Sequence, residues 1–180
     1  MTFRLVLVGM AFCIVFLVGV AGAQDRIPAD PTPLGRPLVT AVQIGDGYGN
    51  LDQPFDVRIT VLEVQRGEKA WVLVRDASES NQPPKAGFEY LLARIRFEYL
   101  AKTGNYTTGL DSFLATTAEG EEYETPSIKP PKPAFGGRLY PDDSLEGWIA
   151  FQVARDDRKP LMTFSQTGIQ GPGRVWFQLH

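Results

Sequence analysis

The sequence predicts an all-β protein built as an antiparallel β-sandwich. Within residues 86–102, Ala93, Ile95, Phe97 and Tyr99 share one parity, and charged residues occupy the other. A period of two is typical of a strand that buries one face. The 180 residues include 18 glycines and 14 prolines, a composition that indicates many turns between short strands.

Other segments fit the same architecture. Both parities are apolar around Leu91 and Leu92, as expected of a central strand that is covered on two faces. In residues 55–64 the apolar parity changes between Val61 and Leu62, which predicts a β-bulge. Further strands are expected at residues 70–74, 113–117, 121–124, 145–153, 161–164 and 174–179, the second and third of them forming a hairpin.

The first 23 residues have the pattern of a secretory signal peptide. Arg4 precedes an apolar run at residues 5–20, and Ala21-Gly22-Ala23 supplies small residues for cleavage. The run approaches the roughly 20 residues that span a bilayer, so an uncleaved membrane anchor is the alternative. We therefore expect a secreted or periplasmic protein, or a membrane-anchored one if the N-terminal segment is not cleaved.

The mature chain is expected to be one domain preceded by a linker. Cys13 lies inside the apolar run, so cleavage leaves no cysteine for a disulfide, a nucleophile or a metal. Residues 24–50 are rich in proline and glycine and are predicted to be a linker, with residues 38–44 as either a short strand or its continuation. The sandwich is predicted to span residues 51–180.

Several motifs, taken in order, resemble a family of small exported bacterial domains of unknown function. Some members of that family carry the label telomeric repeat-binding factor. The likeness rests on residues 59–67 (ITVLEVQRG), 83–97 (PPKAGFEYLLARIRF), 112–123 (SFLATTAEGEEY), 143–153 (DSLEGWIAFQV) and 159–164 (KPLMTF).

The shared patterns are G-x-E-Y, x-G-x-x-Y and L-x-G-x-x-x-F-x-V, and the likeness covers about residues 55–179. One departure is Tyr99-Leu100, where the family usually has an asparagine after the central strand. The resemblance implies an immunoglobulin-like antiparallel β-sandwich and export. It supplies no catalytic residues.

No motif for catalysis, a metal or a cofactor is present in the sequence. The only histidine is His180, which alone forms neither a catalytic triad nor a histidine-rich metal site. The carboxylate pairs Asp142/Asp143 and Asp156/Asp157 stand in turn contexts, where aspartate bonds to the backbone. We expect no enzyme activity and no cofactor. A net charge of −3 without a basic cluster also disfavours nucleic-acid binding.

Two regions are candidates for contact with a partner. Residues 125–141 contain five prolines, two aromatics at Phe135 and Tyr140, and basic residues that include Lys132 and Arg138. The second region consists of Trp148 and Trp176, whose parity is opposite to that of the inner residues of their strands. They form an exposed aromatic surface, or the N-terminal tail or the proline-rich loop covers them, or they pack in the core if the opposite face is the inner one.

The function expected is that of an exported, non-catalytic binding or interaction module of the cell envelope. Its partner would be a protein or a glycan there, with membrane contact only through an uncleaved N-terminus. One alternative is an anchored accessory subunit that positions another protein. Another is a hydrolase with two carboxylates within ~10 Å in one cleft.

Overall fold

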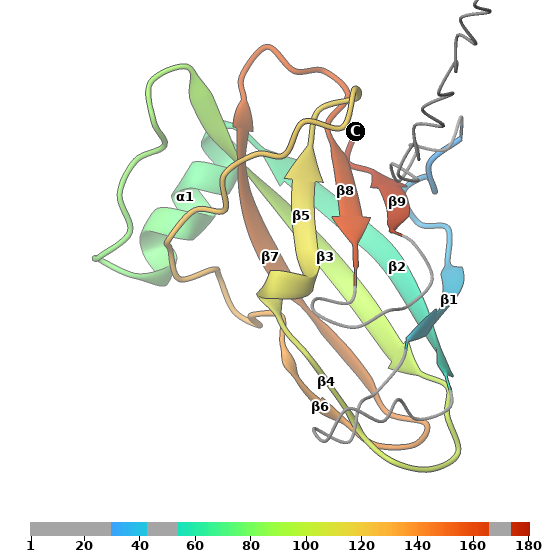
Figure 1. Ribbon diagram of the computed structural model, residues 1–180. Coiled ribbons are helices and arrows are strands. Elements are labelled where there is room, and N and C mark those ends of the chain that lie inside the picture. Colours follow the sequence, from blue (N-terminus) through green and yellow to red (C-terminus); the bar gives the residue numbers. More distant parts are fainter. Residues whose placement is uncertain (1–29, 43–53, 166–173) are drawn as a thin grey trace, which may run out of the picture.

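The computed structural model describes residues 30–42, 54–165 and 174–180, and two facing antiparallel sheets dominate this part of the chain (Figure 1). The large sheet has the order β1-β2-β3-β7, the small sheet β5-β8-β9, and β4 and β6 form a ribbon. The strands are β1 (Leu38–Val42), β2 (Phe55–Arg66), β3 (Phe88–Tyr99), β4 (Tyr106–Thr108), β5 (Phe113–Thr116), β6 (Gly137–Leu139), β7 (Ser144–Ala154), β8 (Leu161–Phe164) and β9 (Val175–Gln178). The predicted immunoglobulin-like antiparallel β-sandwich is confirmed.

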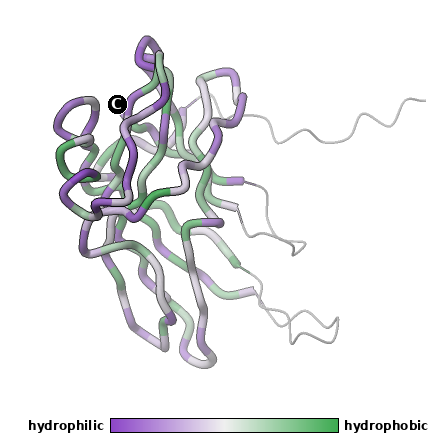
Figure 2. Tube along the Cα trace, turned by 90° about the vertical axis from the view of Figure 1, so that its left-hand side faces the viewer, coloured by the Kyte–Doolittle hydropathy of each residue, from purple (hydrophilic) through white to green (hydrophobic). Residues whose placement is uncertain are grey.

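Strand β3 lies between β2 and β7, and around Leu91 and Leu92 it is buried on both faces, as predicted. Leu91 faces the main core between the sheets, whereas Leu92 faces a second apolar cluster on the outer side of the large sheet. Both side chains are fully buried. Figure 2 shows hydrophobic and hydrophilic residues alternating along the strands, with hydrophilic residues gathered in turns near the C-terminus.

The predicted β-bulge in β2 is also confirmed. The register between β2 and β3 shifts between Val61 and Glu63. The carbonyl of Val61 accepts a hydrogen bond from the amide of Gly35 at 2.8 Å. The bulge therefore both reverses the buried parity of β2 and receives the N-terminal segment.

Residues 70–74, predicted to be a strand, belong instead to helix α1 (Glu68–Ala77). Five consecutive apolar residues fit either period, and the structure selects the helical one. Ala70 and Val74, four residues apart, are both buried against Tyr90 and Leu92 on the outer face of β3 (Figure 1). A helix covers this apolar patch with one face and leaves its other face in solvent.

Residues 30–37, expected to lie in the linker, and residues 38–42, expected as a short strand or as its continuation, are part of the sandwich. The amide of Thr32 donates to the carbonyl of Trp176 at 2.9 Å, and the carbonyl of Thr32 accepts from the amide of Gln178 at 2.8 Å. Strand β1 then pairs with β2 along its whole length. This segment thus connects the edge of the small sheet to the edge of the large one.

Other sequence expectations lie outside the described residues. They are the signal peptide at residues 1–23 with Cys13, and the remaining parts of the expected linker, residues 24–29 and 43–50. In the described part of the chain, no helix is long and apolar enough to cross a membrane.

The proline-rich segment at residues 125–136, here called the strap, runs along the free edge of β7. Trp148 donates its amide to the carbonyl of Pro133 at 2.8 Å and accepts the amide of Phe135 at 3.1 Å. Gly147 permits this approach, because a Cβ at that position would lie 2.5 Å from the backbone nitrogen of Phe135. The glycine of the L-x-G-x-x-x-F-x-V motif therefore has a packing role.

Asn81 joins the strap to the end of α1. Its Nδ2 donates to the carbonyl of Val74 at 2.7 Å and to that of Lys129 at 2.8 Å. Its Oδ1 accepts the amide of Lys129 at 2.9 Å. One buried side chain therefore satisfies three backbone groups and ties α1 to the strap.

We expect Gly147→Ala to lower the free energy of unfolding by about 1–3 kcal/mol, because the added methyl group collides with backbone that has no rotamer to change. Chemical denaturation followed by circular dichroism measures the effect. Ser144→Ala, an exposed change in the same strand, is the matched control and should leave stability nearly unchanged. Equal stability of both variants would show that the strap does not approach β7 this closely.

Candidate functional site

Two of the six predicted contact residues are buried. Trp176 and Phe135 are each 5% exposed. Phe135 belongs to the main core and packs edge-on against Phe113 at 5.2 Å between ring centroids. The prediction of an exposed contact residue is therefore wrong for Phe135, because a place in a proline-rich loop does not show what a side chain packs against. Trp176 follows the alternative of a covered residue.

The other four predicted contact residues have different surroundings. Trp148 is half-buried and packs against the apolar cluster under α1, while its backbone holds the strap. Lys132 in the strap and Arg138 in β6 are exposed, and Tyr140 is 53% exposed. A contact role for Lys132, Arg138 and Tyr140 stays a prediction.

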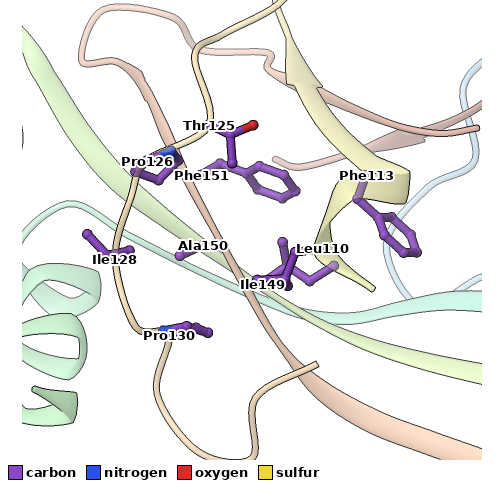
Figure 3. A pocket seen from close by; sticks show the side chains of 9 residues that line it. All are labelled: Leu110, Phe113, Thr125, Pro126, Ile128, Pro130, Ile149, Ala150 and Phe151. Carbon is purple, nitrogen blue, oxygen red and sulfur yellow. The ribbon is translucent and has the colours of Figure 1, made fainter. Parts of the chain in front are cut away.

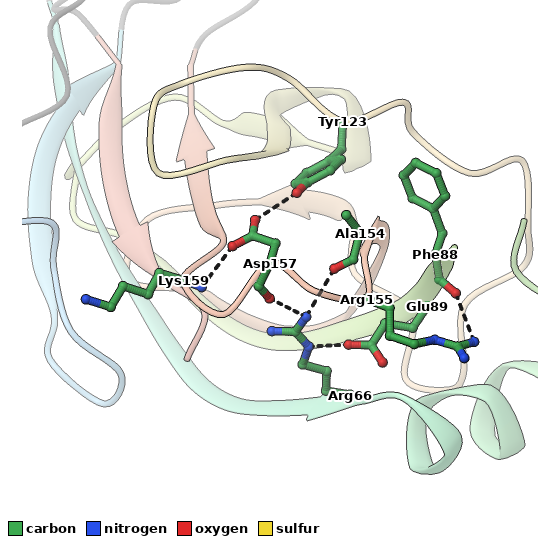
Figure 4. Close-up of polar contacts among 8 residues, drawn as sticks. All are labelled: Arg66, Phe88, Glu89, Tyr123, Ala154, Arg155, Asp157 and Lys159. Atoms are coloured by element: carbon green, nitrogen blue, oxygen red, sulfur yellow. Dashed lines mark hydrogen bonds and ion pairs between the residues drawn. The ribbon is translucent and has the colours of Figure 1, made fainter. Parts of the chain in front are cut away.

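Four polar side chains from separate segments form a cluster at the end of the sandwich where β2 and β7 end and β3 begins (Figure 4). Arg66 Nε donates to Glu89, and Arg66 Nη2 donates to the carbonyl of Asp157 at 2.6 Å. The carboxylate of Asp157 accepts the Tyr123 hydroxyl at 2.8 Å and the amide of Lys159 at 2.9 Å. We call Arg66, Glu89, Tyr123 and Asp157 the polar cluster.

The polar cluster accounts for two of the motifs in the sequence. Glu89 is the acidic residue of G-x-E-Y, and Tyr123 is the tyrosine of x-G-x-x-Y. Glu89, near the start of β3, pairs with Arg66 at the end of β2, and Tyr123 bonds to Asp157 in the turn after β7. We interpret these motifs as structural, since the hydrogen bonds that the residues make are internal to the fold.

The surroundings of Tyr123 shift the pKa of its hydroxyl. Burial first, and then its hydrogen bond to Asp157, raise the pKa of Tyr123 to about 12. The neutral hydroxyl is the form that donates to Asp157, so the folded protein favours protonated Tyr123.

Beside the cluster lies an open hollow of about 520 Å³, which we call the helix-end hollow. It lies between the first turn of α1, the loop before β3 and the ends of β3 and β7. Its lining includes Glu68, Trp71, Pro83, Pro84, Glu89 and Arg155. Its volume falls within the range of roughly 300–1,000 Å³ that is typical of ligand sites.

The aromatic wall of this hollow is held in place by the fold. Trp71 is half-buried and stacks on Tyr90, with 5.9 Å between ring centroids and 22° between ring planes. The hydroxyl of Tyr90 donates to the carbonyl of Gln82 at 2.9 Å, directly before the two prolines of the rim. Trp71 therefore lines the hollow with an indole whose position is fixed from behind.

A second pocket lies between the strap and β7 and is too small for a ligand. It measures about 20 Å³ and is lined mainly by apolar side chains, among them Phe113, Ile128, Ile149 and Phe151 (Figure 3). A water molecule needs roughly 10–15 Å³ of such space and several polar partners. We interpret this pocket as a packing gap beneath the strap.

In each carboxylate pair one aspartate bonds to backbone in a turn, as predicted. Asp157 accepts hydrogen bonds from the Tyr123 hydroxyl and from the amide of Lys159. Asp143 accepts the amide of Tyr140 at 2.9 Å, and Asp142 pairs with Lys102 at 3.0 Å. Among the residues that the structure describes, no group of three histidine, cysteine, aspartate or glutamate side chains is placed to hold a metal ion.

Sequence reasoning did not identify Trp71 or Arg155 as site residues. The sequence predicts a strand at residues 70–74, which include Trp71, and it assigns no role to Arg155. The helical spacing of Ala70 and Val74, with Glu68 in the first turn, is the signal that places Trp71 on a helix. No local signal in the sequence brings Arg155 next to it.

No family model and no curated protein matches this sequence. The fold is similar to that of the yjhA protein of Bacillus subtilis, with a TM-score of 0.51, 8% identity, and 83% and 99% of the two chains covered. It is also similar to ycdA, a presumed lipoprotein of Bacillus subtilis, with a TM-score of 0.51, 14% identity and 68% of this chain covered. This chain spans only 35% of ycdA. At these identities the likeness shows the β-sandwich fold alone.

We expect Tyr123 to make folding stability fall at alkaline pH. Its pKa rises from 10.0 in the unfolded chain to about 12 in the fold, so its contribution is complete below pH 10 and is lost as pH rises towards 12. Denaturation curves between pH 8 and 12 should show a shallower alkaline loss for Tyr123→Phe than for the original protein. Burial also raises the pKa of Tyr106 to about 12, so both proteins still lose some stability at alkaline pH. An equal alkaline loss of stability in both proteins would contradict the raised pKa of Tyr123.

Proposed function

We propose that the protein is an exported, non-catalytic binding module of the cell envelope whose ligand occupies the helix-end hollow. The N-terminal pattern of Arg4, an apolar run and Ala21-Gly22-Ala23 supports export. In this proposal the chain belongs to the family of exported domains that its motifs resemble. The finer assignment rests on the hollow, which the motifs alone do not indicate.

The observation that carries the binding role is Trp71. A tryptophan that lines an open hollow, with its ring fixed by a stacked tyrosine, offers a large apolar surface at small entropic cost. Charged groups from Glu68, Glu89 and Arg155 stand around it. Such a combination of one aromatic wall and a few polar groups is typical of ligand sites.

The polar cluster holds the end of the sandwich beside the hollow. Arg66 holds Glu89, which lines the hollow, whereas Asp157, which does not line it, accepts hydrogen bonds from Tyr123 and from the amide of Lys159. All of these bonds are internal to the fold. We therefore assign the polar cluster a supporting role beside the hollow.

We expect Trp71→Ala to abolish most capture of envelope material by the immobilised protein. Removing a central aromatic contact of this kind costs 2 kcal/mol or more, or roughly thirtyfold in affinity. Leu73→Ala is the matched control, since Leu73 is 39% exposed on the same helix and does not line the hollow. Pull-down from a native envelope extract, quantified by mass spectrometry and carbohydrate analysis, compares the three proteins. Equal capture by all three would refute the assigned site and favour the accessory-subunit alternative.

Export has a separate test. Cleavage after Ala23 predicts that the exported form begins at Gln24. N-terminal sequencing of protein recovered outside the cytoplasm reads this residue directly. A chain that begins at Met1 would instead indicate a retained anchor.

A further inference from the structure

We propose that the ligand of the helix-end hollow is a neutral saccharide, with one pyranose ring stacked on Trp71; this inference deepens the proposed function and rests on it. The argument depends on three features of the hollow: its aromatic wall, the signs of its polar groups, and the surroundings of β3.

The aromatic wall fits the apolar face of a sugar ring. Tyr90 lies against one face of the Trp71 indole, so Trp71 meets the hollow with the surface that Tyr90 leaves uncovered. The axial C–H groups of a pyranose form a flat apolar face that packs on an aromatic ring by dispersion. Because the indole is already immobilised, little rotamer entropy is lost on binding.

The polar groups of the hollow include both donors and acceptors. The guanidinium of Arg155 only donates hydrogen bonds, whereas the carboxylates of Glu68 and Glu89 only accept them. A ligand carboxylate would satisfy Arg155 but meet two like charges, and an ammonium group would meet the arginine. A hydroxyl group both donates and accepts, so neighbouring hydroxyls of a neutral sugar satisfy both kinds of partner.

Glu89 and Arg155 each retain polar atoms that a ligand can contact. Arg66 binds Oε1 of Glu89, which leaves Oε2 outside that ion pair. Arg155 is exposed, and its Nη2 makes a long contact of 3.4 Å with the carbonyl of Phe88. Figure 4 shows the guanidinium of Arg155 directed at the carbonyl of Phe88, and both Arg155 and Glu89 line the hollow. The pair therefore combines a fixed acceptor with an exposed donor.

An extended peptide has less to bind here. Peptides that add to a sheet need an unpaired strand edge. At this end of the sandwich β3 is hydrogen-bonded to β2 on one side and to β7 on the other. The hollow offers rings and charged side chains, and it offers no row of free backbone groups from β3.

Isothermal titration of the purified protein tests the inference. The probes are neutral oligosaccharides of glucose and of N-acetylglucosamine, their monosaccharides, an acidic oligogalacturonide and a proline-rich peptide. We expect binding of at least one neutral oligosaccharide, a loss of tenfold or more in Trp71→Ala, and a loss of about tenfold in Arg155→Gln. Stronger binding of the oligosaccharide than of its monosaccharide would identify a polymer as the source.

Three further variants serve as controls. Leu73→Ala and Arg158→Gln alter an exposed residue on α1 and an exposed arginine outside the hollow, and should bind within twofold of the original protein. Trp71→Phe keeps an aromatic ring and should retain part of the affinity if Trp71→Ala fails to fold. Saccharide binding that survives in both Trp71→Phe and Trp71→Ala without loss would overturn the proposal.

The outcomes separate this inference from the proposed function. If only the peptide or the acidic oligosaccharide binds, and binding depends on Trp71, the neutral saccharide is refuted while the binding site stands. If no neutral saccharide binds and Trp71→Ala leaves capture from the envelope extract unchanged, both proposals fail.

Discussion

The burial of β3 on both faces around Leu91 and Leu92 is the constraint on which the rest of the structure depends. Leu91 enters the main core, and Leu92 enters a separate cluster on the outer face. Fully burying such a side chain contributes about 1.5–3 kcal/mol, so the outer face needs a cover. Helix α1, only ten residues long, would not be stable alone and gains its stability from this contact. The same packing brings Trp71 to the rim of the hollow.

Segments without regular structure complete the sandwich at its edges. The strap covers the edge of β7, where Gly147 leaves room for its backbone, and the chain around Thr32 covers the edge of β9. Exposed strand edges invite pairing with other chains, and both devices remove that hazard. Asn81 links the strap to α1, so the helix that covers the outer face of β3 and the strap along β7 support each other.

The sequence predicted the strands with regular alternation and missed features that depend on distant partners. Alternation located β2, β3 and β7, and the parity change placed the bulge after Val61. The apolar run of α1 fits either a strand or a helix, and the uncovered outer face of β3 selects the helix. Trp176 had the parity of an outer residue but is buried. The hollow is lined by residues more than 80 positions apart, such as Glu68 and Arg155. Their spacing in the sequence does not indicate that they lie close together.

Hydrogen exchange of the Ala70→Asp variant tests most directly whether packing on the outer face of β3 holds α1 in place. Ala70 is fully buried between α1 and the sheet, and a carboxylate there has no partner in the apolar cluster around it. We predict that the amides of α1 lose their protection while those of β3 and β7 keep theirs. Unchanged protection of α1, or loss of protection in α1 and the sheet together, would contradict an outer cluster that is separable from the main core.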